Sequence, residues 1–388
     1  MICASHLNQK LSRHETKRAG GGVVLVCPAK DPNRNAQHEN ATRVSVAKRL
    51  AVLKGYDFGG EYDAAIADWR RRYFVPADTL VGIEATRKLG ILDEENFFGG
   101  LVPYPFMATK TITHRLVNSS ATAPEGWTEN FASRVQSVVL LGFATFTLED
   151  ARLACARVLQ SGDARLKPAL CVGGQGQQVI STLNELDRAL DCIDPMDLST
   201  HGLSIEENLQ NVTTYSVGTV RLEEMRIAYC GTQRVTRDHH HKSVYGGSDL
   251  LVVPGDFDDL LKLNLASEFR AAVKKARVYD VAASTEIPGL IASRRNYDVA
   301  FGEDCHGRRR GGVLEQSWRI GGASPAEVAA LEAFREDPSL IRVRASCAEI
   351  YDARHEPPPH AQISFSGEDT DSGALIKYSV VERYADTR

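Results

Sequence analysis

Two glycine-rich, charge-bearing stretches of the chain combine residue types that bind phosphates and divalent metals. The first runs over residues 165–179 and carries Lys167, Gly173, Gly174 and Gly176. Glycine lets the backbone turn tightly so that its N–H groups face an anion, and the lysine adds positive charge. No Gly-Lys-Ser/Thr sequence of a Walker loop follows, and glycines at this spacing also fit an ordinary hairpin turn. The stretch therefore predicts either a plain turn or a lid over phosphates.

The second stretch carries two carboxylates and an arginine. Asp298 and Glu315 lie in the apolar-flanked segments 296–301 and 311–315, which a polar Gly- and Arg-rich turn separates. An antiparallel hairpin would bring both carboxylates to one Mg2+ through oxygen ligands. Arg319 would then face the phosphates that the metal bridges. A solvated hairpin with scattered charges is the alternative, but the apolar run that ends in Glu, with Arg four residues later, favours the metal site.

At these residues the chain resembles the ATP-grasp superfamily, over roughly residues 106–323, and it is similar to the carboxylate-amine ligases and biotin carboxylase-like proteins. The resemblance implies that two lysines contact the nucleotide and that segment 203–209 is the strand and hinge that bind adenine between two lobes. The nucleotide-binding residues implied in this way are Lys110, Lys167, Gly173, Gly174, Gly176, Glu206, Glu207, Asn208 and Leu209.

The same resemblance assigns the metal site and shows two departures from the superfamily pattern. Asp298 and Glu315 match its metal-binding acidic positions, and Arg319 matches the arginine that follows them. Ser317 stands where the superfamily usually has Asn; it stays a candidate ligand because a hydroxyl coordinates Mg2+ directly or through water. Past the hinge, where many members have a Glu for the ribose hydroxyls, this chain has Thr-Thr-Tyr-Ser at 213–216.

The reaction that the resemblance implies is an ATP-dependent ligation. A small-molecule carboxylate would attack ATP to give an acyl phosphate, which an amine or another nucleophile would displace, with ATP and Mg2+ as cofactors. Arg294 and Arg295, just before Asp298, are candidates for holding the anionic substrate or the acyl phosphate. Two alternatives stay open, a phosphotransferase or carboxylase of the same fold and a nucleotide-binding regulatory or scaffold protein with decayed catalysis.

The composition fits a cytoplasmic enzyme. The 388 residues, 43% hydrophobic and 25% charged, are enough for two or three lobes with their own cores. The net charge of -4 argues against a dedicated nucleic-acid binder. The eight cysteines form no Cys-x-x-Cys pair, which is typical of reduced thiols, and the apolar run 23–27 is too short for a membrane span. We expect no nucleic-acid or membrane partner, and a homodimer is among the expected assemblies.

The elements that must position these residues predict an α/β protein with α+β lobes and a small N-terminal open α/β domain. The resemblance implies that the fold is an ATP-grasp fold, preceded by this pre-ATP-grasp domain. The expected parts are a mobile N-terminus (1–20), the N-terminal domain (21–105), a first lobe with helix, lid and hinge (106–210), a second lobe with the metal hairpin (211–345) and a C-terminal β extension (346–388).

In the first half of the chain, a continuous apolar run predicts a buried strand at 22–27. Periodicity and start signals predict helices at 41–53 and 78–89. The superfamily resemblance adds a helix over 108–117, which would carry Lys110.

In the second half, Ser324 is predicted to cap a helix over 324–334. Residues 244–249 predict a Gly-rich turn ahead of strand 250–253, or alternatively the lining of a substrate pocket. The three histidines at 239–241 cannot all face one side of a strand or helix and do not predict a metal site. Later strands are expected at 340–347, 361–365 and 375–381.

Overall fold

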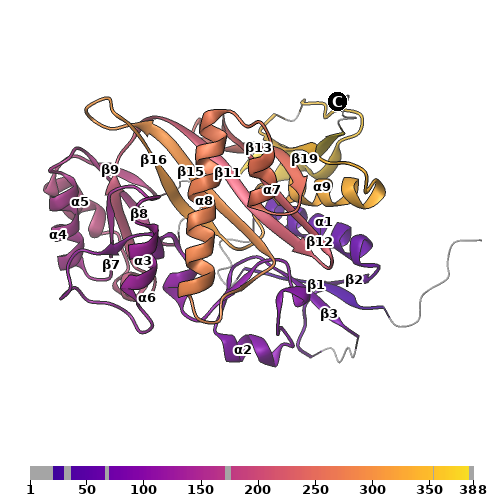
Figure 1. The fold of residues 1–388 in the computed structure, drawn as a ribbon, viewed down its shortest axis with the longest axis horizontal. Helices are drawn as coiled ribbons and strands as arrows, with labels where there is room; N and C mark the ends of the chain where they lie inside the picture. Colours follow the sequence, from indigo (N-terminus) through magenta and orange to yellow (C-terminus); the bar gives the residue numbers. More distant parts are fainter. Residues whose placement is uncertain (1–20, 30–35, 66–69, 171–175, 353, 384–388) are drawn as a thin grey trace, which may run out of the picture.

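The computed structural model describes residues 21–29, 36–65, 70–170, 176–352 and 354–383, so the predictions for 1–20, Gly173 and Gly174 lie outside the described residues. The described chain forms four β-sheets of three, five, eight and three strands, with helices packed between and around them (Figure 1). None of the helices in this part of the chain has the length and apolar character needed to cross a membrane.

The N-terminal segment forms a parallel sheet in the order β2-β1-β3. Its elements are β1 (Val23–Cys27), α1 (Gln37–Lys54), β2 (Asp57–Glu61) and β3 (Arg72–Pro76). The run Val-Val-Leu-Val of β1 is buried, as expected for the middle strand of a parallel sheet. Helix α1 ends at Gly55, which adopts the left-handed conformation (φ +64°) that glycine tolerates best. The predicted strand and helix are therefore confirmed.

A small second sheet, in the order β14-β5-β4, takes up residues 80–81 of the helix predicted over 78–89, of which only residues 83–88 are helical. The segment forms a short strand and then a helix of only six residues, because Gly82 between them has φ +92° and a backbone that no helix contains. The elements are β4 (Leu80–Val81), α2 (Ile83–Lys88), η2 (Glu94–Asn96), β5 (Gly100–Val102) and, much later in the chain, β14 (Ile291–Ala292).

A five-stranded sheet in the order β6-β7-β10-β8-β9 follows, with helices α4 to α6 on it. Its elements are η3 (Pro105–Ala108), η4 (Lys110–Thr113), β6 (Arg115–Leu116), α3 (Glu129–Val135), β7 (Gly142–Thr145), α4 (Leu148–Val158), β8 (Ala164–Pro168), β9 (Gln178–Ile180), α5 (Leu183–Leu190), α6 (Pro195–His201) and β10 (Leu203–Glu207).

The helix predicted over 108–117 is wrong, because the segment forms two 3-10 turns and a short strand. The Thr109 hydroxyl accepts a hydrogen bond from the Thr111 N–H and donates one to the Phe106 carbonyl. Hydroxyl side chains that bond to their own backbone, together with the β-branched run Thr-Ile-Thr, disfavour a continuous helix here.

The largest sheet has eight strands in the order β16-β15-β11-β12-β13-β17-β19-β18, every neighbouring pair antiparallel. Its strands are β11 (Gln210–Leu222), β12 (Met225–Arg237), β13 (Ser243–Pro254), β15 (Arg294–Glu303), β16 (Arg309–Ser317), β17 (Val343–Ile350), β18 (Gln362–Asp369) and β19 (Gly373–Arg383). Three helices accompany it, α7 (Phe257–Lys262), α8 (Ser267–Glu286) and α9 (Ser324–Glu336).

Two sequence predictions about this sheet need correction. Residues 244–249 form no turn, because they lie inside β13, where all but Gly246 pair with β12 and residues 247–249 also pair with β17. Ser324 does not cap α9 but is its first residue, and its hydroxyl accepts a hydrogen bond from the Gly321 N–H. The three C-terminal strands that the sequence predicts do form, and they extend the eight-stranded sheet.

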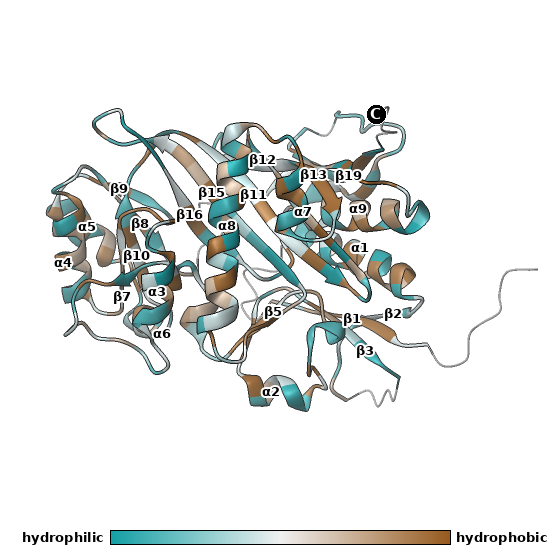
Figure 2. Ribbon diagram, viewed as in Figure 1, coloured by the Kyte–Doolittle hydropathy of each residue, from teal (hydrophilic) through white to brown (hydrophobic). Residues whose placement is uncertain are grey.

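Strand alternation gives this sheet a separate core on each face. Ala228 and Cys230 of β12 pack in the core that contains α8, whereas Ile227 and Tyr229 pack in the core that contains α1 and α9. Helix α8 presents buried residues at 272, 276, 279 and 283, the spacing of one helix face. Figure 2 shows hydrophilic and hydrophobic residues alternating along α8, which lies across the sheet.

Candidate nucleotide and metal site

Strands β15 and β16 form the hairpin that the sequence predicts and bring its two carboxylates together. Asp298 and Glu315 are direct partners in the antiparallel register, with an irregularity just after Asp298. Ser317 lies two residues after Glu315 and is on the same face of the strand. The hairpin thereby places three oxygen-bearing side chains on one of its faces, and all three belong to the hairpin itself.

The electrostatics of this pair suit a divalent cation. Burial and the neighbouring Glu315 carboxylate raise the pKa of Asp298 from 3.8 to about 6, although Asn296 and Gln233 both donate hydrogen bonds to its Oδ1, at 3.0 and 2.8 Å. Within the described residues, no group of three or more His, Cys, Asp or Glu side chains could hold a metal ion. A Mg2+ ion that also binds substrate phosphates is usually held by only one or two protein carboxylates, which is what this hairpin offers.

Lys110 reaches this hairpin from the first part of the chain. Its Nζ lies 3.0 Å from Glu315 Oε2, and its side chain is 4% exposed. Burial would raise the pKa of Glu315, but the ammonium groups of Lys110 and Lys167 outweigh that effect and lower it. The 3-10 turn η4, which contains Lys110, therefore places it beside Glu315 even though the segment is not the predicted helix.

Lys167 lies in a buried group of charges on the five-stranded sheet. It lies in β8, paired with Ser204 of β10, and its Nζ lies 3.0 Å from Glu206 Oε1 and 3.1 Å from the Leu314 carbonyl of β16. His114 Nε2 lies 2.9 Å from the other Glu206 oxygen. Burial would raise the pKa of Glu206, but Lys167 and His114 outweigh it and lower the pKa to about 2. Lys167 thus connects the two sheets.

The hinge residues predicted from the resemblance lie where β10 leaves the five-stranded sheet and β11 enters the eight-stranded one. The Glu207 N–H donates to the Leu141 carbonyl at 2.8 Å, and Glu207 Oε1 accepts from the Leu141 N–H and from Arg310, each at 3.1 Å. Asn208 Oδ1 accepts two hydrogen bonds from Arg165, and Leu209 is buried. These side chains fix the connection between the two sheets.

The glycine predicted for the lid and lying within the described residues is Gly176. It has φ +66° and stands two residues before β9, at the outer edge of the five-stranded sheet. A residue with a side chain would be strained in this left-handed conformation.

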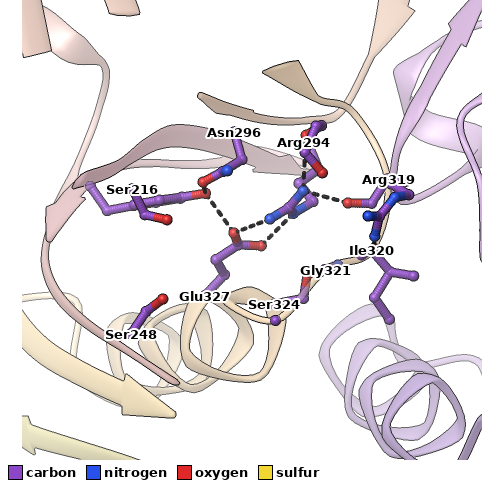
Figure 3. Close-up of polar contacts among 12 residues, drawn as sticks. Ser216, Ser248, Arg294, Asn296, Arg319, Ile320, Gly321, Ser324 and Glu327 are labelled. Carbon is purple, nitrogen blue, oxygen red and sulfur yellow. Dashed lines mark hydrogen bonds and ion pairs between the residues drawn. The ribbon is translucent and has the colours of Figure 1, made fainter. Parts of the chain in front are cut away.

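Arg294 does not have the substrate-holding position predicted for it. Its side chain is 1% exposed and donates two hydrogen bonds to Glu327 of α9, at 2.8 and 2.7 Å. It also donates to the backbone carbonyls of Ser317 and Arg319 (Figure 3). The guanidinium is therefore occupied in holding the connection between β16 and α9 in place.

Arg295 lies on the opposite face of the sheet from Asp298, because consecutive strand residues point to opposite faces. Its guanidinium contacts α8 instead, donating to Asp280 Oδ1 at 3.0 Å and to the Ser284 hydroxyl at 2.5 Å. The Tyr297 hydroxyl donates to the same Asp280 oxygen at 2.6 Å. Arg294 thus shares the strand face of Asp298 but is engaged by Glu327, and Arg295 contacts α8 on the opposite face.

Arg319 is positioned by the close packing of its neighbour. Trp318 is buried, and its Nε1 lies 3.3 Å from the Tyr297 hydroxyl. Gly100 of β5 packs directly on it, since a Cβ at residue 100 would lie 2.5 Å from the Trp318 Cβ. The Arg319 guanidinium donates to the Ile320 carbonyl at 2.6 Å and contributes to the lowered pKa of Glu315. Arg319 is therefore close enough to Glu315 to act on its charge, and its predicted contact with phosphates stays a prediction.

A buried hydrogen-bond network that the sequence did not predict joins the metal hairpin to α9. The Tyr229 hydroxyl lies 2.6 Å from Glu327 Oε1 and 2.9 Å from Asn296 Oδ1. Figure 3 shows Asn296 close to Glu327 and Arg294, and Asn296 in turn bonds to Asp298. Tyr229, Asn296 and Glu327 are separated by 31 to 98 positions along the chain. Of these residues only Glu327 stands out in the sequence, because it lies three positions into a predicted helix. A Glu at that position indicates helix capping rather than a buried ion pair.

The fold that carries this site is the ATP-grasp fold, as the sequence resemblance predicts. Two solved structures of N5-carboxyaminoimidazole synthetase from Staphylococcus aureus superpose on the chain, each at 11% identity. The one complexed with ADP gives a TM-score of 0.52 and covers 94% of both chains, and the other gives 0.50, covering 93% of this chain and 94% of that one. Phosphoribosylamine--glycine ligase from Thermotoga maritima gives a TM-score of 0.49 at 14% identity, covering 94% and 93%.

The chain belongs to the family described as "Protein of unknown function (DUF3182)", whose model matches residues 25–379. No curated protein sequence matches it. The predicted fold class, α/β with an ATP-grasp core, is confirmed by the superpositions.

Proposed function

We propose that the protein is an ATP-dependent, Mg2+-dependent ligase that joins a small-molecule carboxylate to an amine or another nucleophile through an acyl phosphate. The observation that carries the proposal is the convergence of two buried lysines, from separate segments, on the strand that bears a metal-type carboxylate. Lys110 contacts Glu315, and Lys167 contacts the carbonyl of the preceding residue, Leu314. A nucleotide bound with Mg2+ needs carboxylates for the metal and positive charge for the phosphates, and both lie together here.

On this proposal, residues 106–210 and 211–345 form the two lobes around the nucleotide, after an N-terminal domain at 21–105. The lysines exchange their carboxylate partners for phosphate oxygens when ATP binds. Asp298 and Glu315, with Ser317 beside them, hold Mg2+, which supplies charge neutralisation for the phosphates. The hinge residues from Glu206 to Leu209 offer backbone groups to adenine.

The proposed carboxylate substrate lies beside Arg319. The carboxyl end of β3, at Pro76, approaches the connection after β16, because a Cβ at residue 99 would lie within 4 Å of the Pro76 ring, the Trp318 carbonyl and the Arg319 Cα. In open α/β sheets ligands bind outside the carboxyl ends of the strands. Arg319 would hold the acid there by a charge-assisted hydrogen bond.

The reaction has two steps on this proposal. A carboxylate oxygen forms a bond to the γ-phosphorus while the bond from that phosphorus to the β,γ-bridging oxygen breaks and ADP leaves. The amine nitrogen then bonds to the acyl carbon, inorganic phosphate leaves and the nitrogen loses a proton. Positioning and charge neutralisation by the lysines, Arg319 and the two carboxylates carry such transfers, so no protein nucleophile is needed.

A decayed nucleotide-binding scaffold is the second candidate, and Ser317 in place of the usual Asn is the observation that favours it. A hydroxyl is a weaker metal ligand than an amide oxygen in this position, so binding could persist without turnover. The set Lys110, Lys167, Asp298, Glu315 and Arg319 favours the ligase, because a protein that only binds nucleotide has no physical need of both an acidic pair and Arg319.

Phosphate release from ATP separates these candidates. The purified protein with ATP and Mg2+ is screened against pooled carboxylic acids and amines, and against bicarbonate, with Arg319→Lys as the matched variant that keeps the charge but loses the planar fork. We expect release that requires an acid and an amine together and falls at least about tenfold in the variant. Release with bicarbonate alone would indicate a carboxylase, and ATP binding without any release would indicate the scaffold.

A further inference from the structure

A pocket lies at one end of the strands of the N-terminal sheet, and the proposed substrate position lies at the other end. It has a volume of about 570 Å3, and its walls include Lys54, at the end of α1, and Arg72, the first residue of β3. Val23, which opens β1, pairs with Arg72, so the pocket lies at the amino ends of the parallel strands. Substrates of open α/β sheets bind at the carboxyl ends, and this pocket is therefore separate from the site described above.

The lining of the pocket carries an excess of positive charge. Four cationic side chains, those of Lys54, Arg70, Arg71 and Arg72, line it together with the carboxylates of Glu95 and Glu223. This concentration of cations stands out in a chain whose net charge is -4.

The two carboxylates are also engaged by arginines that do not line the pocket. Glu95 lies 3.2 Å from Arg221, and Glu223 lies 3.9 Å from Arg335. Their negative charge is thus shared with cations outside the pocket. Of the lining cations, Lys54 lies 3.3 Å from Glu223 and Arg70 lies 2.8 Å from Asp57, so the excess of cations over carboxylates in the lining rests on Arg71 and Arg72.

The fold holds the ammonium group of Lys54 in place, and it fixes the backbone of Arg71. The Lys54 side chain is 3% exposed, and its ammonium lies over the rings of Tyr56 and Tyr73, 5.0 and 4.6 Å from their centroids, and 3.3 Å from Glu223. Arg71 has its backbone fixed, because its carbonyl accepts a hydrogen bond from the Val23 N–H at 2.7 Å. Groups ordered before a ligand arrives bind it at a lower entropic cost.

We propose that this pocket binds a small phosphate-bearing molecule, a phosphate ester or a diphosphate. Its volume falls in the range of roughly 300–1,000 Å3 that is usual for small-molecule sites. Arginine guanidinium groups match phosphate oxygens in a bidentate geometry, and Lys54 adds a point charge at the inner wall. The ligand would bridge the N-terminal sheet and the turn between β11 and β12, which carries Glu223. This inference does not depend on the proposed ligase activity.

The test is calorimetric titration of the full chain with pyrophosphate at constant ionic strength. Arg71→Glu reverses a charge on the wall, and Arg188→Glu makes the same change at an exposed position of α5 outside the pocket. We expect pyrophosphate to bind the parent, and its affinity to fall at least about tenfold in Arg71→Glu while staying within about twofold of the parent in Arg188→Glu.

A third variant distinguishes this pocket from the candidate nucleotide site. Lys110→Met removes a cation from the latter and keeps the side-chain volume. Pyrophosphate binding that survives Lys110→Met and is weakened by Arg71→Glu supports the proposal. Binding that is lost in Lys110→Met and unchanged in Arg71→Glu places the probe at the nucleotide site and overturns it, as does the absence of binding to the parent at millimolar pyrophosphate.

Discussion

Glu327→Ala is expected to lower the free energy of unfolding by about 3–5 kcal/mol, the cost of leaving a buried charge without its partner. Arg294 is 1% exposed and Glu327 0% exposed, and two hydrogen bonds join them. Burial would lower the pKa of Arg294, but Glu327 outweighs it and raises the pKa. Because a guanidinium is not deprotonated in proteins, Arg294 stays charged after Glu327 is removed. The Tyr229 hydroxyl also loses a partner.

Urea unfolding at pH 7 measures this effect, with Glu336→Ala as the control on the same helix. The Glu336 side chain is 63% exposed and pairs with Arg383 at the surface, so its removal should cost less than about 1 kcal/mol. The double variant Arg294→Met, Glu327→Leu should recover most of the lost stability, because neither charge is then buried. Equal losses in Glu327→Ala and Glu336→Ala would contradict a structural role for the pair.

Lys167→Met should weaken nucleotide binding by between about tenfold and about 150-fold, the range expected when a charged hydrogen bond to phosphate is removed. The substitution keeps most of the side-chain volume in a position that is 2% exposed. His114 continues to contact Glu206, so that carboxylate keeps one partner.

The measurement is titration with a non-hydrolysable ATP analogue, after circular dichroism has established that the variant is folded. Lys262→Met serves as the control, because the Lys262 side chain is 75% exposed on α7. Nucleotide affinity that is the same in Lys167→Met, Lys262→Met and the parent would remove Lys167 from the site.

The sequence predicted best the parts of the site that local pattern determines. Two apolar segments with a polar turn predict an antiparallel pair, and the register of β15 and β16 follows once the strands form, so Asp298 and Glu315 meet. The same reasoning predicted the strand at 22–27 and the helix of which Glu327 is part. In each case one short segment contains the whole signal.

The sequence failed where partners are distant or where alternation decides the outcome. Arg294 and Arg295 look equivalent in the sequence, but one is buried against Glu327 of α9 and the other contacts Asp280 of α8, because neighbouring strand residues face opposite sides. His114 finds its carboxylate 92 positions away. The helix expected around Lys110 failed for a local reason, the capping hydroxyl of Thr109.

The most direct test of the proposed nucleotide and metal site is calorimetric titration with a non-hydrolysable ATP analogue, with and without Mg2+, on the parent and on Glu315→Gln. Glu303→Gln, a change at the far end of the same hairpin, is the matched control. Mg2+ should strengthen binding to the parent and to Glu303→Gln, and this gain should be lost in Glu315→Gln, because an amide is a poorer ligand than a carboxylate. No binding to the parent at millimolar nucleotide, or the same gain from Mg2+ in all three proteins, would contradict the proposed site.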